Sequence, residues 1–225
     1  MTFSIAGRCA KTGMFGIAIS TSSIAVSARC PWVRAGVGAV STQNVTDPRL
    51  GPKGLDLLEE GMPAPVALEE LMKSAPHAGH RQVLMIDAAG RTAHWTGANA
   101  LGTKGTAQGK NCVSGGNLLK HAKVPEALVR SFESDPDRHL ADRLIGALEA
   151  GLADGGEAGP VHSAGVIVMH EQIWPLVDLR VDWADENPIA GLRKLWQAYQ
   201  PQMQDYVTRA LNPEDAPKYG VPGDP

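Results

Sequence analysis

A threonine directly follows the first methionine and begins a stretch, Thr2–Gly7, in which polar and apolar residues alternate. If Met1 is removed, Thr2 carries a hydroxyl group beside its own free α-amine. Such a residue can supply both the nucleophile and the general base of a covalent mechanism. The alternation itself predicts a β-strand. The alternative is an ordinary N-terminal edge strand in which threonine happens to follow methionine.

A predicted hairpin would surround Thr2 with further hydroxyl groups. Thr2–Cys9 and Phe15–Thr21 have the character of two strands, and the turn between them ends in glycine. If the strands pair around that turn, Ser20 and Thr21 return to the neighbourhood of Thr2. We therefore expect these two hydroxyl groups in the shell around the candidate nucleophile.

Three amide side chains stand at the ends of other strand-like runs. The small, apolar run from residue 35 ends at Gln43 and Asn44, and a run that begins near residue 111 ends at Asn117. Amide groups in such positions can orient a substrate or hold the oxyanion of an acyl-transfer intermediate. Asparagine is equally common there as a turn residue. We expect these amides, as substrate-binding or oxyanion groups, near Thr2.

Other kinds of chemistry find little support in the sequence. The seven histidines are dispersed, and the three cysteines, at positions 9, 30 and 112, are widely spaced. Neither a metal site nor a disulfide framework is therefore expected. There is no phosphate-binding glycine motif and no G-x-S-x-G elbow. We expect no metal and no cofactor.

Charge and hydropathy also restrict the partners. The net charge is −3, and no basic cluster marks a nucleic-acid footprint. No stretch approaches the roughly 20 apolar residues of a membrane helix. A basic segment followed by an apolar run, as in a secretory signal, is also missing from the start of the sequence. We expect a cytoplasmic protein that binds neither nucleic acid nor membrane.

The predicted elements alternate in pairs along the chain. Strands are expected at 2–9, 15–21, 24–27, 35–43, 82–87, 92–96, 111–114, 163–169 and 174–181, with a loop at 99–109. Helices are expected at 52–60, 63–74, 124–132, 140–152 and 187–211, the last kinked at Pro201. Such pairing favours an α+β fold, a four-layer αββα sandwich of two stacked, mainly antiparallel sheets. We expect one domain at 1–212 and a Pro/Gly-rich tail at 213–225.

Several longer runs match a family pattern: TFSI at 2–5, RAGVGAVSTQ at 34–43, DPRLGPKGLDLL at 47–58 and DLRVD at 178–182, with TG at 96–97 and GN at 116–117. Together they resemble the bacterial and archaeal domain of unknown function 1028 family, up to about Tyr199. The resemblance implies the αββα fold of the N-terminal nucleophile (Ntn) hydrolases. In that superfamily a Thr, Ser or Cys at the start of the first strand attacks an amide, which here implies Thr2.

The resemblance thus implies an amidohydrolase that cleaves a small amide or peptide-like substrate through Thr2 once Met1 is removed. The alternative is a non-catalytic protein that binds a ligand or assembles with partners on the same scaffold. The superfamily, together with apolar residues such as Trp174 and Trp196, also suggests homo-oligomers. One departure lies at 155–164, where relatives tend to carry an acidic and a basic residue, whereas this chain has Glu157 without the basic residue.

Overall fold

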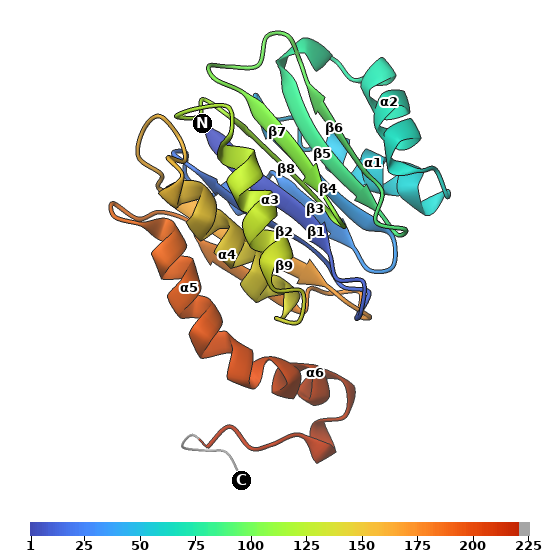
Figure 1. The fold of residues 1–225 in the computed structure, drawn as a ribbon. Helices are drawn as coiled ribbons and strands as arrows, with labels where there is room; N and C mark the ends of the chain where they lie inside the picture. The colour runs from blue at the N-terminus through green and yellow to red at the C-terminus, as the bar shows by residue number, and fades with distance from the viewer. Residues whose placement is uncertain (221–225) are drawn as a thin grey trace.

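Two antiparallel sheets form the centre of the molecule, as the computed structural model of residues 1–220 shows (Figure 1). The six-stranded sheet contains, in spatial order, β10 (Val177–Val181), β9 (Ser163–Met169), β2 (Phe15–Thr21), β1 (Thr2–Arg8), β8 (Cys112–Asn117) and β7 (Gly105–Gly109). The four-stranded sheet contains β3 (Pro31–Arg34), β4 (Gly38–Asn44), β5 (Arg81–Asp87) and β6 (Thr92–Thr96). The first strand is therefore an interior strand, with β2 and β8 on either side, and not an edge strand.

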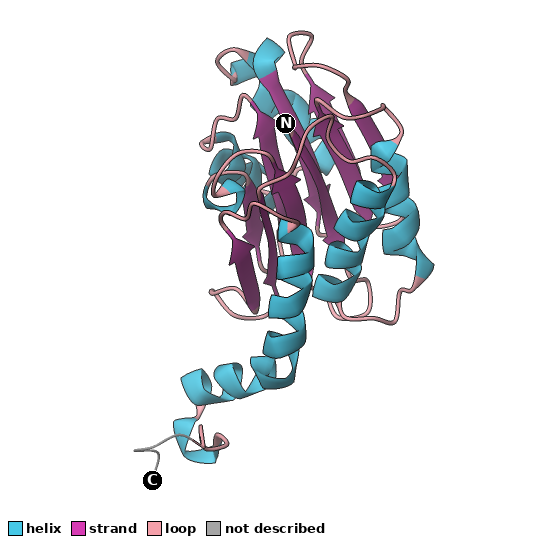
Figure 2. Ribbon diagram, turned by 90° about the vertical axis from the view of Figure 1, so that its left-hand side faces the viewer, coloured by secondary structure: helices cyan, strands magenta, loops and turns pink. Residues whose placement is uncertain are grey.

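Helices cover the outer faces of both sheets. Helices α1 (Leu50–Glu59) and α2 (Ala64–Ser74) pack on the four-stranded sheet, and α3 (Val124–Ser134) and α4 (Leu140–Ala153) pack on the six-stranded sheet. Helix α5 (Pro188–Tyr199) lies beside α4 over β9 and β10, and α6 (Met203–Leu211) projects away from the layers (Figure 2). The predicted four-layer αββα sandwich is confirmed.

Strand β1 is buried on both faces because apolar layers lie on each side of it. Phe3 and Ile5 belong to the core that the sheet forms with α3 and α4. Ala6, two positions after Ser4, belongs to the core between the two sheets, and Ser4 itself makes hydrogen bonds with the facing strand β4. Because side chains alternate along a strand, Thr2 shares the face of Ser4 and Ala6. The candidate nucleophile therefore points into the layer between the sheets.

The structure departs from the expected elements in three places. Residues 24–27 are not a strand, because Ala25 adopts a left-handed conformation (φ 50°) and leads into a short 3-10 turn at Val26–Ala28. Residues 99–109 are not all loop, because β7 forms at their end as an edge strand without alternating apolar residues. Strand β3 was not expected, since it has only four residues and begins at Pro31, which cannot donate a hydrogen bond to a neighbouring strand.

The C-terminal helical region divides where expected. Helices α5 and α6 are separated by a 3-10 turn at residues 200–202 that contains Pro201, which cannot donate a helical hydrogen bond. Trp196 of α5 is buried against the ring of His139, so it is not available to a partner surface, whereas Trp174 is 36% exposed. Within residues 1–220, no helix combines the length and apolar character needed to cross a membrane. The end of the expected tail, residues 221–225, lies outside the described residues.

Candidate active site

A row of polar side chains crosses the six-stranded sheet at the end where β1 begins. The register pairs Thr2 with Thr21 on one side and with Asn117 on the other, and Thr21 pairs in turn with Ser163 of β9. Directly paired residues of antiparallel strands have side chains on the same face. All four are buried, and Asn117 makes a hydrogen bond across to the second sheet. The row thus faces the layer between the sheets.

The hydroxyl group of Thr2 is enclosed by its immediate neighbours. Thr2 is only 6% exposed, and its Oγ1 lies 3.2 Å from Oγ1 of Thr21. Both hydroxyl groups donate a hydrogen bond to the main-chain carbonyl oxygen of Met1. The methionine carbonyl therefore holds both hydroxyl groups in place, and removal of Met1 would release them.

The side chain of Met1 occupies the space beside this row. It packs against the loop between α4 and β9, where a Cβ added to Gly159 would lie 3.0 Å from Met1 Cε. A glycine at position 159 therefore makes room for the methionine. Met1 is half-buried, so its removal would leave an opening that borders Thr2.

A carboxyl group lies in the same loop. Glu157 is 5% exposed, its Oε2 accepts a hydrogen bond of 3.2 Å from the backbone N–H of Ser22, and its Oε1 is buried without a hydrogen-bond partner among the described residues. Its backbone forms a bridge with Leu119, two residues beyond the end of β8. Burial raises the pKa of Glu157 to about 8, although the positive α-amine of Met1 and the Ser22 hydrogen bond oppose the shift. This carboxyl group is therefore electrostatically coupled to the chain's amino terminus.

The sequence gives little indication that Glu157 lies near Thr2. Glu157 stands in the glycine-rich run Gly155–Gly159 just before β9, and neighbouring residues supply no cation of their own. Its position near the end of β2 and the amino terminus depends on how the α4–β9 loop folds, at a separation of more than a hundred residues in the chain. Local patterns do not report such a contact.

The facing sheet contributes an amide network. Ser4 Oγ donates to Gln43 Oε1 at 2.7 Å, and Gln43 Nε2 donates to Gln82 Oε1 at 2.8 Å. Asn117 Nδ2 donates to the same Gln82 oxygen at 3.2 Å, while Asn117 Oδ1 is buried without a partner among the described residues. Gln82 therefore joins the two sheets beside Thr2. It was not expected in the site, since it looks like the start of an ordinary buried strand.

Two of the expected residues lie elsewhere. Ser20 pairs with Phe3 and so lies on the opposite face of the sheet from Thr2, where its Oγ donates to the Ser163 carbonyl at 3.1 Å. One residue along a strand reverses the face, which separates Ser20 from Thr21. Asn44, with φ 73°, is tied to main-chain groups of other loops, at 2.6 Å to the His80 carbonyl and 3.2 Å to the Leu101 N–H.

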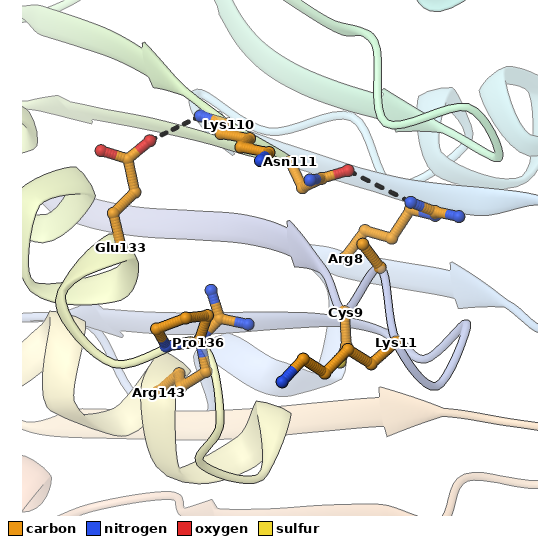
Figure 3. A pocket seen from close by; sticks show the side chains of 9 residues that line it. Arg8, Cys9, Lys11, Lys110, Asn111, Glu133, Pro136 and Arg143 are labelled. Atoms are coloured by element: carbon orange, nitrogen blue, oxygen red, sulfur yellow. Dashed lines mark hydrogen bonds between the residues drawn. The ribbon is translucent and has the colours of Figure 1, made fainter.

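A cavity of about 430 Å³ lies at the other end of β1 (Figure 3). Its lining residues come from the β1–β2 turn, the β7–β8 turn and the α3–α4 region: Arg8, Cys9, Ala10, Lys11, Lys110, Asn111, Glu133, Pro136 and Arg143. None of the expected site residues lines it. In the described part of the chain, no group of three or more His, Cys, Asp or Glu side chains is placed to hold a metal ion.

The chain is similar to a known protein family and to several solved structures. The profile of the family of unknown function (DUF1028) matches residues 2–192. The crystal structure of the DUF1028 protein SPO2555 from Silicibacter pomeroyi has a TM-score of 0.82 at 28% identity, covering 88% of this chain and 89% of that chain. Anbu (ancestral beta-subunit) from Yersinia bercovieri has a TM-score of 0.41 at 10% identity, covering 90% and 96%. An Anbu (Gly-1) mutant from Hyphomicrobium sp. strain MC1 has 0.42 at 13%, covering 92% and 99%. No curated protein matches.

Proposed function

The chain belongs to the DUF1028 family, and from the geometry at the start of β1 we propose that it is an amidohydrolase of the Ntn type. The proposed nucleophile is Thr2 after removal of Met1. The observation that carries the proposal is that the hydroxyl groups of Thr2 and Thr21 converge on one carbonyl oxygen, that of Met1. Once Met1 is removed, the carbonyl group of a substrate can take up that position.

In the proposed reaction, Thr2 Oγ1 attacks the carbonyl carbon of an amide, and the free α-amine of Thr2 accepts the hydroxyl proton. Collapse of the tetrahedral intermediate breaks the C–N bond, and the leaving amine takes the proton from the α-amine. Water then hydrolyses the acyl ester on Thr2, which releases a carboxylic acid and restores the hydroxyl group. An α-amine has an ordinary pKa of about 7.7–8.0, close to the range in which a general base is effective.

The neighbouring groups have supporting roles in this proposal. Thr21 Oγ1, 3.2 Å from Thr2 Oγ1, orients the nucleophile. Asn117, paired with Thr2 in register, is the candidate to contact the substrate or its oxyanion, and Gln82 holds its side chain. Gln43 has an indirect role in this proposal: its amide nitrogen donates to the same Gln82 oxygen and so helps to hold the Gln82 side chain.

Glu157 is the proposed partner of the new amino terminus. Its Oε1 has no hydrogen-bond partner among the described residues, so it can accept a hydrogen bond from an amine. The α-amine of Met1 already acts on Glu157 by lowering its pKa against the effect of burial. A carboxyl group in this position would orient the amine of Thr2 and favour its protonated state between the two proton transfers.

The proposed substrate is a small amide or a peptide-like molecule. The space to be opened beside Thr2 is that of one methionine residue, bordered by Gly159 and the loop that carries Glu157. A substrate of roughly that size fits, whereas a folded protein chain does not reach a hydroxyl group that is 6% exposed.

The test compares two forms of the full chain, released from an N-terminal fusion so that one begins at Thr2 and the other at Met1. We expect an electrophilic acyl probe, such as a β-lactone, to form an ester on Thr2 only in the form without Met1, as located by tandem mass spectrometry. Thr2→Ala should prevent the adduct, and Thr208→Ala on the remote helix α6 should not. Absence of an adduct on Thr2 in the Met-free form would contradict the proposal and favour the non-catalytic alternative.

A further inference from the structure

The cavity at the end of β1 takes no part in the proposed chemistry of Thr2. Three separate segments build its walls. Arg8 comes from the end of β1, Lys110 from the β7–β8 turn, and Glu133 and Arg143 from α3 and α4. In Figure 3 these side chains surround an open middle, with Lys110 above, Arg143 below, Glu133 on one side and Arg8 on the other.

Arg143 is the most informative residue of this cavity. It is only 8% exposed, and within residues 1–220 it makes no ion pair. Its Nε and Nη2 donate to the Phe132 carbonyl at 3.1 and 2.9 Å, and its guanidinium carbon lies 3.9 Å from the centre of the Phe132 ring. Neutral groups therefore position this cation from behind, and no described residue forms a hydrogen bond with Nη1. A buried charge without a counter-charge is costly in a protein unless a ligand supplies one.

Two further cations of the cavity lack a carboxylate partner among the described residues. Arg8 Nη1 donates to the neutral Asn111 Oδ1 at 3.2 Å, and Lys110 makes no side-chain ion pair. Lys11, by contrast, is paired with Asp137 on the exposed rim.

One carboxylate of the lining, that of Glu133, lies among these three cations. Glu133 Oε1 accepts the backbone N–H of Lys110 at 2.6 Å. Outside the lining, the exposed carboxylate of Asp135 also acts on Arg143. The three cations without an ion pair, Arg8, Lys110 and Arg143, therefore exceed the nearby carboxylates and leave a net positive charge at the cavity.

The thiol of Cys9 on the cavity wall is affected by local hydrogen bonds and, to a smaller extent, by the charge of Arg143. Burial acts to raise the pKa of this thiol, but hydrogen bonds from Thr12 and Lys11 and the charge of Arg143 bring it below its usual value. The electrostatic environment thus favours negative charge at this point.

We propose that this cavity is a binding site for a small organic dianion whose acidic groups are phosphate or carboxylate. Three cations of the lining can contact the oxygens of a dianion, and the planar guanidinium of Arg143 suits phosphate and carboxylate oxygens alike. The volume of about 430 Å³ falls within the roughly 300–1,000 Å³ typical of small-molecule pockets. It exceeds what an inorganic anion needs, so the ligand has an organic portion that fills the space beside Cys9 and Pro136.

Isothermal titration calorimetry of the full chain tests the site with four probes: inorganic phosphate, glycerol 3-phosphate, succinate and the neutral succinamide. We expect at least one organic dianion to bind more tightly than inorganic phosphate, with affinity that falls as salt is added. Succinamide should not bind. Loss of one charge-assisted contact should weaken binding about tenfold in Lys110→Met and about 100-fold in Arg143→Met.

Arg130→Met is the matched control, because Arg130 is an exposed arginine of α3 that pairs with Glu126 and does not line the cavity. Its affinity should stay within twofold of the parent protein. Because Arg143 is buried and could be needed for folding, Arg8→Met provides a second variant beside Lys110→Met, with a loss of about tenfold expected.

Each outcome decides the proposal. Preference for glycerol 3-phosphate assigns a phosphate monoester, and preference for succinate assigns a dicarboxylate. Absence of organic dianion binding at low salt would overturn the proposal. So would equal binding of succinamide, or an unchanged affinity in the folded Lys110→Met and Arg8→Met variants.

Discussion

At its first residue, strand β1 brings neutral hydroxyl and amide groups together in a buried layer, whereas at its last residue it brings a cation to the wall of an open cavity. Around Thr2 the polar atoms bond to one another: Thr21, Asn117 and Gln82 are all buried and all hydrogen-bonded. Around Arg8 the charged groups of the cavity wall line an open cavity. The two ends belong to the same strand of the same sheet.

The difference shows what burial permits at each end. Neutral hydroxyl and amide groups can satisfy each other between two sheets, because each can both donate and accept. Guanidinium and ammonium groups only donate, so three of them together cannot satisfy one another. At the first end, with Met1 present, most of the polar groups are paired within the protein, with Asn117 Oδ1 and Glu157 Oε1 as exceptions among the described residues. At the second end, in our proposal, a ligand supplies the missing partners of the cations. Because Thr2 and Arg8 are the first and last of the seven residues of β1, roughly 20 Å apart, the two ends can be perturbed independently.

The largest expected effect concerns the nucleophile. In the Met-free form, Thr2→Ala should lower turnover of an amide substrate by about 10³-fold or more, since removal of a covalent nucleophile leaves only binding and electrostatic contributions. Anion binding at the cavity should stay within twofold in the same variant. Steady-state kinetics and calorimetry measure the two effects. Thr2→Ser, which keeps a hydroxyl group, should retain measurable turnover, and unchanged turnover in Thr2→Ala would remove the catalytic role.

The second effect concerns the stability of the buried network. Gln82→Ala should lower the free energy of unfolding by about 2–4 kcal/mol, because Gln43 Nε2 and Asn117 Nδ2 would lose their shared acceptor. At the other end, Lys110→Ala should change the free energy by less than about 0.5 kcal/mol. Urea unfolding of both variants measures the contrast. Equal effects at the two ends would show that the polar row is no more tightly packed than the cavity rim.

The third effect concerns pH. The folded-state pKa of Glu157, about 8, lies above its unfolded value of 4.5, so the folded protein holds a proton that the unfolded chain has lost. The free energy of unfolding should therefore fall as pH rises from about 5 to 7, by about 2.5 kcal/mol. Glu157→Gln should flatten this slope, as measured by urea unfolding at several pH values. Glu186→Gln is the control, because Glu186 is an exposed residue just before α5. A pH dependence that persists unchanged in Glu157→Gln would contradict its assignment to Glu157.

The smallest effect concerns ligand-linked stability at the basic end. A dianion present at ten times its Kd should stabilise the protein by about 1.4 kcal/mol, a rise in Tm of about 3–6 °C. Differential scanning fluorimetry at constant ionic strength measures the shift. The shift should disappear in Arg143→Met and persist in Arg130→Met. A rise of the same size in both variants would be a general salt effect and not binding at the cavity.

The sequence determined much of the Thr2 end by local pattern alone. Alternation from Thr2 onward and a short glycine-ended turn predicted the first hairpin and the return of Ser20 and Thr21 toward Thr2, and the structure pairs Thr21 with Thr2. The pairing of strands between pairs of helices likewise predicted the αββα layers. These features are local because adjacent residues alone decide a turn and a strand period.

The face of the sheet on which each strand residue lies was harder to predict. Ser20 and Thr21 both return toward Thr2, but only Thr21 shares its face, because each step along a strand reverses the side chain. The prediction included both residues since the turn was not defined to a single residue. The function, the oligomeric state and the division at residue 212 stay predictions.

Contacts between distant segments were decided by the tertiary structure alone. Asn117 reaches Thr2 because β8 pairs with β1 across more than a hundred residues, and Gln82 reaches Asn117 from the other sheet. A loop brings Glu157 within electrostatic range of the amino terminus, and the basic cavity is assembled from three segments that show no basic motif in the sequence. The spacing of apolar residues indicates whether a segment forms a helix or a strand. It does not indicate which remote segment packs against it. The sequence thus identified the strand on which we propose the chemistry, and the packing of the two sheets decided which end of that strand is buried and which end borders a cavity.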